Sequence, residues 1–340
     1  MKMTEITRIG VIGAGAWGTT LANFLAEKDF QVDLWVREEE VFQQIRDERI
    51  NKVFLPEAKL VDQLNPVRTF EEALDGKKLI LLVIPSHFLR EVLKNLKPYL
   101  TSGMSLMAAT KGIENDSLMI MSQVVEDVID SDYLADFAYI AGPSFAKEVY
   151  QRTPTAVTLA CRDLAHGEKL QHLFHRPFFR VYLSKDLIGA QLGGALKNVI
   201  AIAAGISDGL NYGTNTRAAL ITRGLAEITR LGVAMGANPL TFSGMTGMGD
   251  LVLTCTGDLS RNRTVGLKIG RGMRIKEITN NMTMVAEGVK TSLSAYLLGK
   301  KMGVDMPITS QVYQILYEDK DPKEAVKYLL NRDLRLELEY

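Results

Sequence analysis

Cysteine is scarce in this chain: only Cys161 and Cys255 occur among 340 residues. Two cysteines exclude a disulfide framework, so reduced thiols are the simpler interpretation. An excess of charge of one sign is also lacking, because 40 Lys and Arg balance 40 Asp and Glu. Without net positive charge the chain has no general electrostatic attraction for nucleic acid or for an anionic membrane. Any anion-binding site must therefore be a local cluster of cations.

Long apolar runs are missing as well. The first eight residues lack the apolar core of a signal peptide. The longest apolar run, residues 199–206, is far shorter than the ~20 residues of a membrane span. The sequence therefore predicts a cytoplasmic protein without a membrane span. A composition of 46% hydrophobic and 24% charged residues is typical of a globular protein, and the length favours two domains.

Histidine is rare, with four residues in all. His166, His172 and His175 cluster in sequence, but neither an acid nor a cysteine completes a metal-ligand set near them. We therefore expect surface histidines and no metal site. Cys255 has no neighbouring histidine in sequence, and we interpret it as a small buried side chain rather than a nucleophile.

The first half of the chain alternates between apolar runs and helical patterns. Seven strands are expected, at residues 8–12, 32–36, 79–84, 105–109, 137–140, 155–160 and 178–183. Strands that alternate with helices predict an α/β fold with an open, mostly parallel, doubly wound sheet of the Rossmann type. Beyond residue 186 the pattern is helical, which predicts an all-α C-terminal domain. We expect a dinucleotide-binding domain at residues 1–188 and a helical substrate and catalytic domain at residues 189–340.

A glycine motif follows the first predicted strand directly. Residues 13–18, Gly-Ala-Gly-Ala-Trp-Gly, fit the pattern G-x-G-x-x-G and open a predicted helix. Gly13 permits a tight turn, Gly15 lets the backbone approach a pyrophosphate, and Gly18 allows close packing of helix on strand. The helix N-terminus offers N–H groups and a positive dipole end to the phosphates. The motif predicts a dinucleotide site.

The end of the second predicted strand selects between cofactors. NAD-binding proteins usually carry an acid there, whereas this chain has Arg37 followed by Glu38. Arg37 can pair with a 2′-phosphate, and Glu38 can accept a hydrogen bond from a ribose hydroxyl. We expect NADP or NAD as the cofactor, with NADPH preferred. The alternative is a solvated surface arginine.

A long apolar helix predicted at residues 187–207 carries Lys197 near its middle. A buried lysine can exchange a proton near neutral pH, whereas a lysine that reaches the surface would have no such role. Gly193 and Gly194 precede it by one turn and weaken the helix, so something must approach closely there. We expect that a substrate or a nicotinamide does so.

Further candidates lie in the loops. Asp250 is a single acid among glycines, and Ser260, Arg261 and Asn262 crowd at a probable helix start, as in phosphate sites. Ser260 can also be simply an N-cap. Lys111 and residues 142–146 follow predicted strands at their carboxyl ends, where open α/β sheets bind ligands.

Taken together, these residues resemble the soluble NAD(P)-dependent glycerol-3-phosphate dehydrogenases of bacteria. The matching motifs occur in family order and span most of the chain, at residues 13–18, 84–86, 109–112, 141–146, 193–198, 247–256, 260–262 and 287–288. Two departures are Ala16, where many members have Ser, and Phe54, where many have Tyr. Neither touches the chemistry.

The resemblance implies reversible reduction of dihydroxyacetone phosphate to sn-glycerol 3-phosphate, which supplies glycerophospholipid synthesis. It also implies a C-terminal domain like that of 6-phosphogluconate dehydrogenase, a homodimer, and small-molecule substrates without nucleic acid. The implied catalytic residues are Lys197, Lys111 and Asp250. The implied cofactor-binding residues are Gly13, Gly15, Ala16, Trp17, Gly18, Arg37, Lys111, Gly142, Ala146, Arg261, Val285 and Glu287. The implied substrate-binding residues are Lys111, Gly142, Ser144, Lys197, Asn198, Asp250, Ser260, Arg261 and Asn262.

Two other functions remain open at this point. The first is that of another β-hydroxyacid dehydrogenase relative, which shares the two domains and a Lys-Asn pair, although Ser260 to Asn262 favour a small phosphorylated triose. The second is a non-catalytic NAD(P) sensor or scaffold, in which Lys197, Lys111 and Asp250 would be structural.

Overall fold

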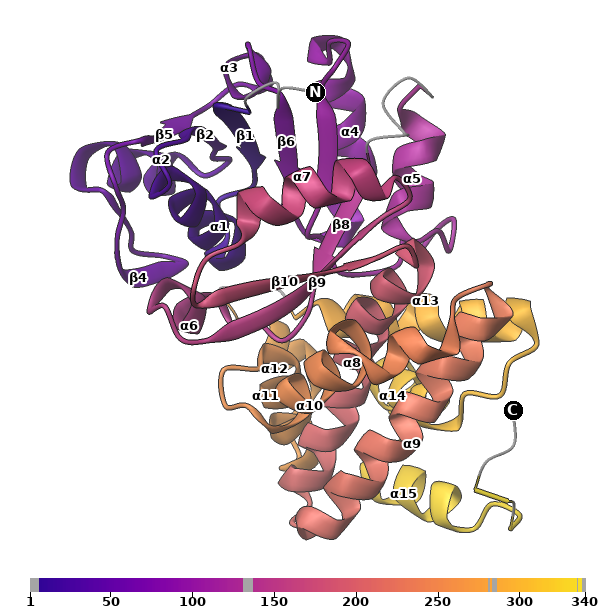
Figure 1. Ribbon diagram of the computed structural model, residues 1–340. Coiled ribbons are helices and arrows are strands. Elements are labelled where there is room, and N and C mark those ends of the chain that lie inside the picture. Colours follow the sequence, from indigo (N-terminus) through magenta and orange to yellow (C-terminus); the bar gives the residue numbers. More distant parts are fainter. Residues whose placement is uncertain (1–5, 131–136, 281, 283–285, 335, 338–340) are drawn as a thin grey trace. The chain divides into compact units, whose positions relative to one another are not determined.

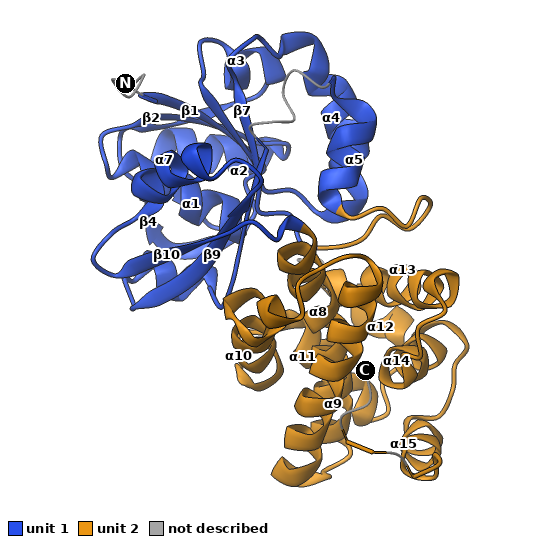
Figure 2. Ribbon diagram, turned by 45° about the vertical axis from the view of Figure 1, so that its right-hand side comes forward, with its two compact units in different colours: residues 1–111, 121–187 blue, residues 112–120, 188–340 orange. Residues whose placement is uncertain are grey.

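The computed structural model describes residues 6–130, 137–280, 282, 286–334 and 336–337. The chain forms two compact units (Figure 2). Unit 1 comprises residues 1–111 and 121–187, and unit 2 comprises residues 112–120 and 188–340. The expected division at residue 188 did not anticipate that residues 112–120 group with the helical unit. Each unit is described below by itself.

Unit 1 is built on an eight-stranded sheet (Figure 1). The strand order is β10-β9-β8-β7-β6-β1-β2-β5, and every pairing is parallel except that between β8 and β9. The strands are β1 (Arg8–Ile12), β2 (Gln31–Trp35), β5 (Leu64–Val67), β6 (Leu79–Leu82), β7 (Ser105–Ala108), β8 (Ala138–Ala141), β9 (Thr155–Cys161) and β10 (Phe179–Ser184). The predicted doubly wound, mostly parallel sheet is confirmed.

The order of the strands reverses at β1, which lies between β2 and β6. In sheets of this kind the carboxyl ends of the parallel strands meet at one edge, and ligands bind outside that edge at the reversal point. β6 is entirely buried, as its unbroken run of leucines and isoleucine predicts for a central strand. The sheet thus places the turn after β1 where a dinucleotide site belongs.

Seven α-helices accompany the sheet in the described part of unit 1. They are α1 (Ala16–Ala26), α2 (Glu39–Gln43), α3 (Phe70–Leu74), α4 (Leu89–Leu96), α5 (Met121–Val128), α6 (Ala146–Tyr150) and α7 (Leu164–Phe174). Helix α2 continues as a π-helical stretch, Gln44–Glu48. A separate antiparallel pair, β3 (Ile50–Asn51) and β4 (Leu55–Lys59), follows it.

Strand β5 was not predicted from the sequence. Pro66 interrupts its apolar pattern, and proline lacks the N–H that a central strand needs. The structure resolves this conflict, because β5 lies at the end of the sheet order and pairs only with β2. An edge strand tolerates proline where its N–H would face away from the ladder.

The described residues of unit 2 from 188 to 330 are mainly helical, as predicted. Its helices are α8 (Leu187–Gly209), α9 (Gly213–Ala234), α10 (Asp250–Thr256), α11 (Arg261–Gly270), α12 (Ile275–Asn280), α13 (Glu287–Met302), α14 (Pro307–Tyr317) and α15 (Pro322–Leu330). A short 3-10 helix, Pro239–Ser243, and a π-helical turn, Met245–Gly249, precede α10.

Helix α8 forms the centre of unit 2. Leu192, Val199 and Ile202 are fully buried in its core. By length and composition alone α8 is long and apolar enough to cross a membrane, although polar residues such as Lys197 and Asn198 interrupt its apolar pattern. However, 89% of that apolar window is buried inside the protein, which is the position of a core helix.

Residues 112–120 leave unit 1 and pack into the core of unit 2. Ile113 and Ile120 are 2% and 1% exposed and belong to the apolar cluster of α8 and its neighbours. The Ser294 hydroxyl of α13 donates a hydrogen bond to the Ile113 carbonyl at 3.2 Å. The segment is therefore held both by apolar burial and by a buried hydrogen bond.

Candidate active site

The turn after β1 has the geometry that its glycines predict. Gly13 has a φ of +116°, which side-chain-bearing residues rarely adopt, and a Cβ there would lie 2.5 Å from the Val83 carbonyl oxygen. A Cβ at Gly18 would clash with the Gly13 carbonyl oxygen. The backbone of the turn and the start of α1 are therefore pressed together, and only glycine fits at these two positions.

Gly15 differs from its two neighbours. It is the N-cap residue of α1 with a φ of −67°, and no described atom lies within 4 Å of a Cβ placed on it. Neither backbone conformation nor protein packing therefore requires glycine there. A glycine beside open space at a helix N-terminus fits the close approach of a pyrophosphate. The residues present thus fit a dinucleotide.

Asn51 fixes the turn from outside the motif. Its side-chain amide is fully buried and donates to the Ala14 carbonyl at 2.8 Å and to the Thr19 hydroxyl at 2.9 Å. The Thr19 hydroxyl in turn donates to the same Ala14 carbonyl. Sequence reasoning missed Asn51, because it lies 37 residues from the carbonyl that it holds.

At the end of β2, Arg37 and Glu38 form an ion pair. The Arg37 guanidinium donates to the Glu38 carboxylate at 2.7 and 2.9 Å and lies over the Phe88 ring, 5.2 Å from its centroid. The Arg37 side chain is 60% exposed. Both side chains expected to read the cofactor ribose are thus accessible and near each other.

Lys111 follows β7 at the same edge of the sheet. Its ammonium group lies 3.4 Å from the Gly142 carbonyl oxygen, to which the Ser144 hydroxyl also donates at 3.0 Å. Gly142 comes directly after β8. Three residues predicted from strand ends are therefore brought together, since parallel strands carry them to one edge.

The remaining cofactor candidates of unit 1 lie on helices. Trp17 is in the first turn of α1 and packs partly buried against the core of unit 1, beside Ala16. Ala146 begins α6, and its carbonyl accepts a hydrogen bond from the Thr20 hydroxyl of α1 at 3.3 Å. Residues 146 and 16–18 therefore come from neighbouring helices, although 126 residues separate Thr20 from Ala146.

In unit 2, Lys197 is buried and paired. It is 6% exposed, so the alternative of a lysine that reaches the surface is wrong. Its ammonium group contacts the carboxylate of Asp250, which is 1% exposed, and donates to the Thr254 hydroxyl at 2.8 Å. The Thr254 hydroxyl donates to the Asp250 carbonyl at 2.6 Å, one turn back along α10. The ammonium group is thus held between two side chains of a single helix.

Thr254 was not among the candidates from the sequence. A threonine four residues after an acid on a helix is unremarkable by itself. Only the packing of α10 against α8 shows that both side chains face Lys197, 53 and 57 residues away.

Two buried asparagines link three helices beside this cluster. The Gly288 amide of α13 donates to the Asn262 side-chain oxygen at 2.9 Å, and the Asn262 amide donates to the Asn198 side-chain oxygen at 2.8 Å. This order of donors leaves the Asn198 amide nitrogen as a donor. The chain of amides therefore fixes the orientation of the Asn198 side chain, which follows Lys197 on α8.

Around the start of α11, the phosphate candidates separate into different roles. Ser260 is the N-cap, and its hydroxyl accepts from the Arg263 amide at 3.2 Å. Arg263 itself is bound to the carboxylates of Asp208 and Asp258. Desolvation lowers the pKa of the Arg261 guanidinium, and nearby Glu287 opposes this shift. Val285 falls outside the described residues.

Some expectations were wrong. A Cβ at Gly193 would clash with the Thr246 carbonyl oxygen, so what approaches α8 there is backbone rather than a ligand. His166 is buried, not a surface residue, and its Nε2 lies 2.6 Å from the Ser105 hydroxyl oxygen. Cys255 is buried as expected, and burial raises the pKa of its thiol to about 12, which makes it a poor nucleophile.

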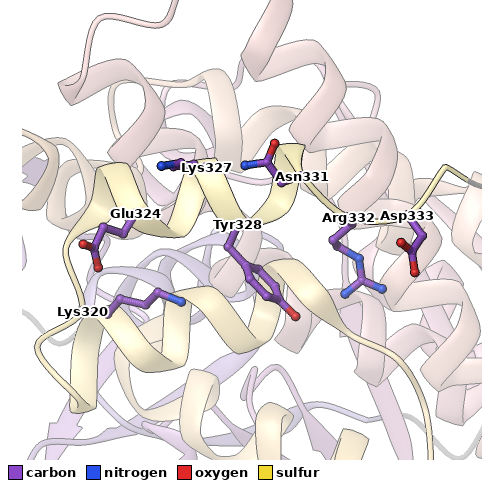
Figure 3. Close-up of a pocket in the computed structure, with 7 residues that line it drawn as sticks. All are labelled: Lys320, Glu324, Lys327, Tyr328, Asn331, Arg332 and Asp333. Carbon is purple, nitrogen blue, oxygen red and sulfur yellow. The ribbon is translucent and has the colours of Figure 1, made fainter.

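A depression of about 710 Å³ on unit 2 lies elsewhere (Figure 3). It is lined by Lys320, Glu324, Lys327, Tyr328, Asn331, Arg332 and Asp333. Lys320 donates to Gln311 and Gln314, and Arg332 is paired with Asp305. None of the predicted site residues lines this depression.

The glycine turn at the strand reversal and the buried lysine of a helical unit define a class: a two-unit, dinucleotide-binding oxidoreductase. The comparisons with known proteins are more specific. Residues 8–166 match the profile of the NAD-dependent glycerol-3-phosphate dehydrogenase N-terminus, and residues 186–327 match that of the C-terminus. The chain belongs to the NAD-dependent glycerol-3-phosphate dehydrogenase family.

Individual relatives agree with this assignment. The chain is 57% identical to the glycerol-3-phosphate dehydrogenase (NAD(P)+) of Geobacter metallireducens over 97% of this chain and 98% of that relative. It is 40% identical to the crystal structure of glycerol-3-phosphate dehydrogenase from Coxiella burnetii, with a TM-score of 0.91 over 96% of this chain and 99% of that one. A ketopantoate reductase from Ralstonia eutropha, 14% identical with a TM-score of 0.59 over 94% of this chain and 99% of that one, shares the fold alone.

Proposed function

We propose that the protein catalyses the reversible NAD(P)H-dependent reduction of dihydroxyacetone phosphate to sn-glycerol 3-phosphate. The observation that carries this proposal is the buried ammonium group of Lys197, held by Asp250 and Thr254 in a family member whose unit 1 has a complete glycine turn. Ketone reduction builds negative charge on oxygen, and a positioned ammonium group can stabilise that charge and then protonate it.

The proposal assigns dinucleotide binding to residues 1–188 and substrate binding with catalysis to residues 189–340, while residues 112–120 pack with the helical unit. In unit 1 the glycine turn at residues 13–18 holds the pyrophosphate, with Ala16, Trp17, Gly142 and Ala146 beside the dinucleotide. The reduced nicotinamide, when bound, supplies the hydride. Arg37 pairs with a 2′-phosphate and so favours NADPH. We also assign Arg261, Val285 and Glu287 to cofactor binding, as the family resemblance implies.

The substrate is recognised by its phosphate and its carbonyl. Arg261, with the N-cap Ser260 and Asn262 at the start of α11, binds the phosphate, since donors at a helix N-terminus suit an anion. Ser144, Gly142 and Lys111 complete its binding, and Lys111 also polarises the carbonyl. Asn198 donates to a substrate oxygen. Lys197 delivers the proton, and Asp250 tunes Lys197 or relays the proton to it.

The test is to follow NADPH absorbance in purified protein with and without dihydroxyacetone phosphate, and then to repeat the assay with NADH. Oxidation that requires the triose phosphate supports the proposal. Folded protein that binds NADPH but oxidises neither cofactor when dihydroxyacetone phosphate is present would be a cofactor sensor, and the proposed reaction would be rejected. A panel of hydroxy acids in the same assay separates this function from that of a β-hydroxyacid dehydrogenase.

The same proposal carries three broader expectations. We propose that the enzyme is a homodimer, which sedimentation velocity tests. We also propose that it acts in the cytoplasm and that its product supplies glycerophospholipid synthesis. Depletion of the protein should then lower the cellular pool of sn-glycerol 3-phosphate and slow phospholipid labelling.

A further inference from the structure

A second arginine lies at the end of β2, brought there by the unpredicted strand β5. β2 and β5 pair in parallel up to Trp35 and Val67, so the residues that follow both strands emerge side by side. Arg68 comes directly after β5. The Trp35 indole N–H donates to the Arg68 carbonyl at 3.0 Å, which fixes the backbone of Arg68 beside β2. In Figure 1 the two strands are neighbours at one end of the sheet.

The Arg68 side chain reaches the backbone that leads into Arg37. One guanidinium nitrogen of Arg68 donates to the carbonyls of both Val36 and Arg37, each at 2.7 Å. The Arg68 guanidinium is therefore bound to the backbone at the end of β2, where NAD-binding proteins place an acid for the ribose. Arg68 also fixes the direction in which the chain leaves β2, and with it the starting point of the Arg37 side chain.

Each of the two arginines has a glutamate partner. Arg37 pairs with Glu38 at 2.7 Å, and Arg68 pairs with Glu39 at 3.4 Å. The Arg68 and Glu39 side chains are 36% and 62% exposed, so this pair is open to solvent and weakly held. Two guanidinium groups with replaceable partners match a phosphate monoester, which carries close to two negative charges at neutral pH.

We propose that Arg68 is the second cation of the 2′-phosphate subsite and that Glu39 competes with the phosphate for it. This inference rests on the proposed use of NAD(P)H by unit 1. With NADPH, both arginines exchange a carboxylate for the phosphate. With NADH, Arg68 keeps Glu39, and Glu38 accepts the ribose hydroxyl. The pair of glutamates thus lets one site accept either cofactor.

The experiment measures binding by calorimetry, with four ligands and no turnover. NADPH is compared with NADH, and adenosine 2′,5′-bisphosphate with adenosine 5′-monophosphate, since each pair differs only in the 2′-phosphate. The variants are Arg68→Gln, Glu39→Gln and Arg46→Gln. Arg46 is a matched control because it too lies over the Phe42 ring and pairs with a neighbouring acid, Asp47.

Arg68→Gln should raise the Kd of both 2′-phosphate ligands about tenfold or more, as loss of a charged hydrogen-bond donor does. It should change the Kd of NADH and of the monophosphate by less than about twofold. Glu39→Gln, an exposed change that leaves the backbone contacts of Arg68 intact, should lower the Kd of the 2′-phosphate ligands. Arg46→Gln should alter none of the four.

Equal weakening of NADPH and NADH by Arg68→Gln would overturn the inference, because it would mean that Arg68 only shapes the backbone. An unchanged NADPH affinity in both Arg68→Gln and Glu39→Gln would also overturn it. Either result leaves the proposed function standing if triose-phosphate-dependent oxidation persists. Wild-type protein that binds neither cofactor would overturn both proposals.

Discussion

The turn after β1 and the cluster around Lys197 are built in opposite ways. The turn uses backbone atoms of six consecutive residues, and its side chains matter mainly where they are missing, at Gly13 and Gly18. The cluster uses three side-chain polar groups from two helices, separated by more than 50 residues in sequence. A backbone site should therefore fail when an atom is added, and a side-chain site should fail when one is removed.

The largest effect is expected from removal of the ammonium group. Lys197→Met should lower kcat about a thousandfold, because the proton donor is lost. The Kd of NADPH, measured by fluorescence titration, should stay the same. Lys301 of α13 is exposed, so Lys301→Met is the control and should behave as wild type.

Met at position 197 leaves the Asp250 carboxylate buried without its cation, which can destabilise the protein by itself. The double variant Lys197→Met with Asp250→Asn removes that charge. If the double variant recovered wild-type turnover, the catalytic role of Lys197 would have to be abandoned.

The glycine turn offers the reverse test. Gly18→Ala should destabilise unit 1 by about 3 kcal/mol, because the new Cβ meets a backbone oxygen that cannot move away. Gly15→Ala should leave thermal unfolding unchanged, since its Cβ meets no described atom, yet it should weaken the binding of NADPH and NADH alike. Unimpaired cofactor binding in Gly15→Ala would contradict a pyrophosphate at this turn.

Buried charges extend the comparison to stability. In unit 1 the buried Lys77 ammonium is paired with Asp33. In unit 2 the buried Glu227 carboxylate accepts instead from the amides of Ile308 and Thr309 and from the Thr309 hydroxyl, at the start of α14. Burial raises the pKa of Glu227 from its ordinary 4.5 to about 7, although these donors and Arg230 oppose the shift.

Because its folded-state pKa lies above the unfolded value, Glu227 stabilises the fold most below pH 4.5, and this contribution is lost as the pH rises through about 7. The loss should be about 3 kcal/mol. Denaturant unfolding of wild type and Glu227→Gln from pH 5 to pH 8 measures it. The unfolding free energy of wild type should fall relative to that of Glu227→Gln as the pH rises. A difference between the two proteins that is independent of pH would contradict a titrating Glu227.

The smallest effect is expected at Thr254, which positions the lysine but does not react. Thr254→Val removes one hydrogen bond to the ammonium group and should lower kcat about tenfold, with KM little changed. Thr254→Ser restores the hydroxyl and should restore turnover. A valine variant that serine fails to rescue would point to packing, not to the hydrogen bond.

The parts of the fold that depend on neighbouring residues were predictable. The glycine turn, the buried parallel strands and the apolar helix α8 each follow from a pattern confined to one segment. The predicted N-cap Ser260 is confirmed for the same reason, because capping involves residues only three apart.

The missed features depend on which segments pack together. Pro66 concealed an edge strand, and with it the position of Arg68 beside Arg37. Asn51, Thr254 and the buried His166 carry no local signal, because each is explained by a partner 32 to 61 residues away. Sequence periodicity predicts the helix or strand in which a residue lies, whereas these roles depend on contacts between two elements.

Residues 112–120 have a consequence for synthesis of the chain. The ribosome delivers Ile113 and Ile120 well before α8 and α13, whose side chains bury them in the core of unit 2. A nascent polypeptide that has reached residue 187 therefore still displays two isoleucines without their final surroundings. For the same reason, a fusion of residues 1–188 to the helical unit of another protein would place residues 112–120 in a core that does not match them. Recombination between relatives should therefore exchange residues 112–120 together with the helices that enclose them.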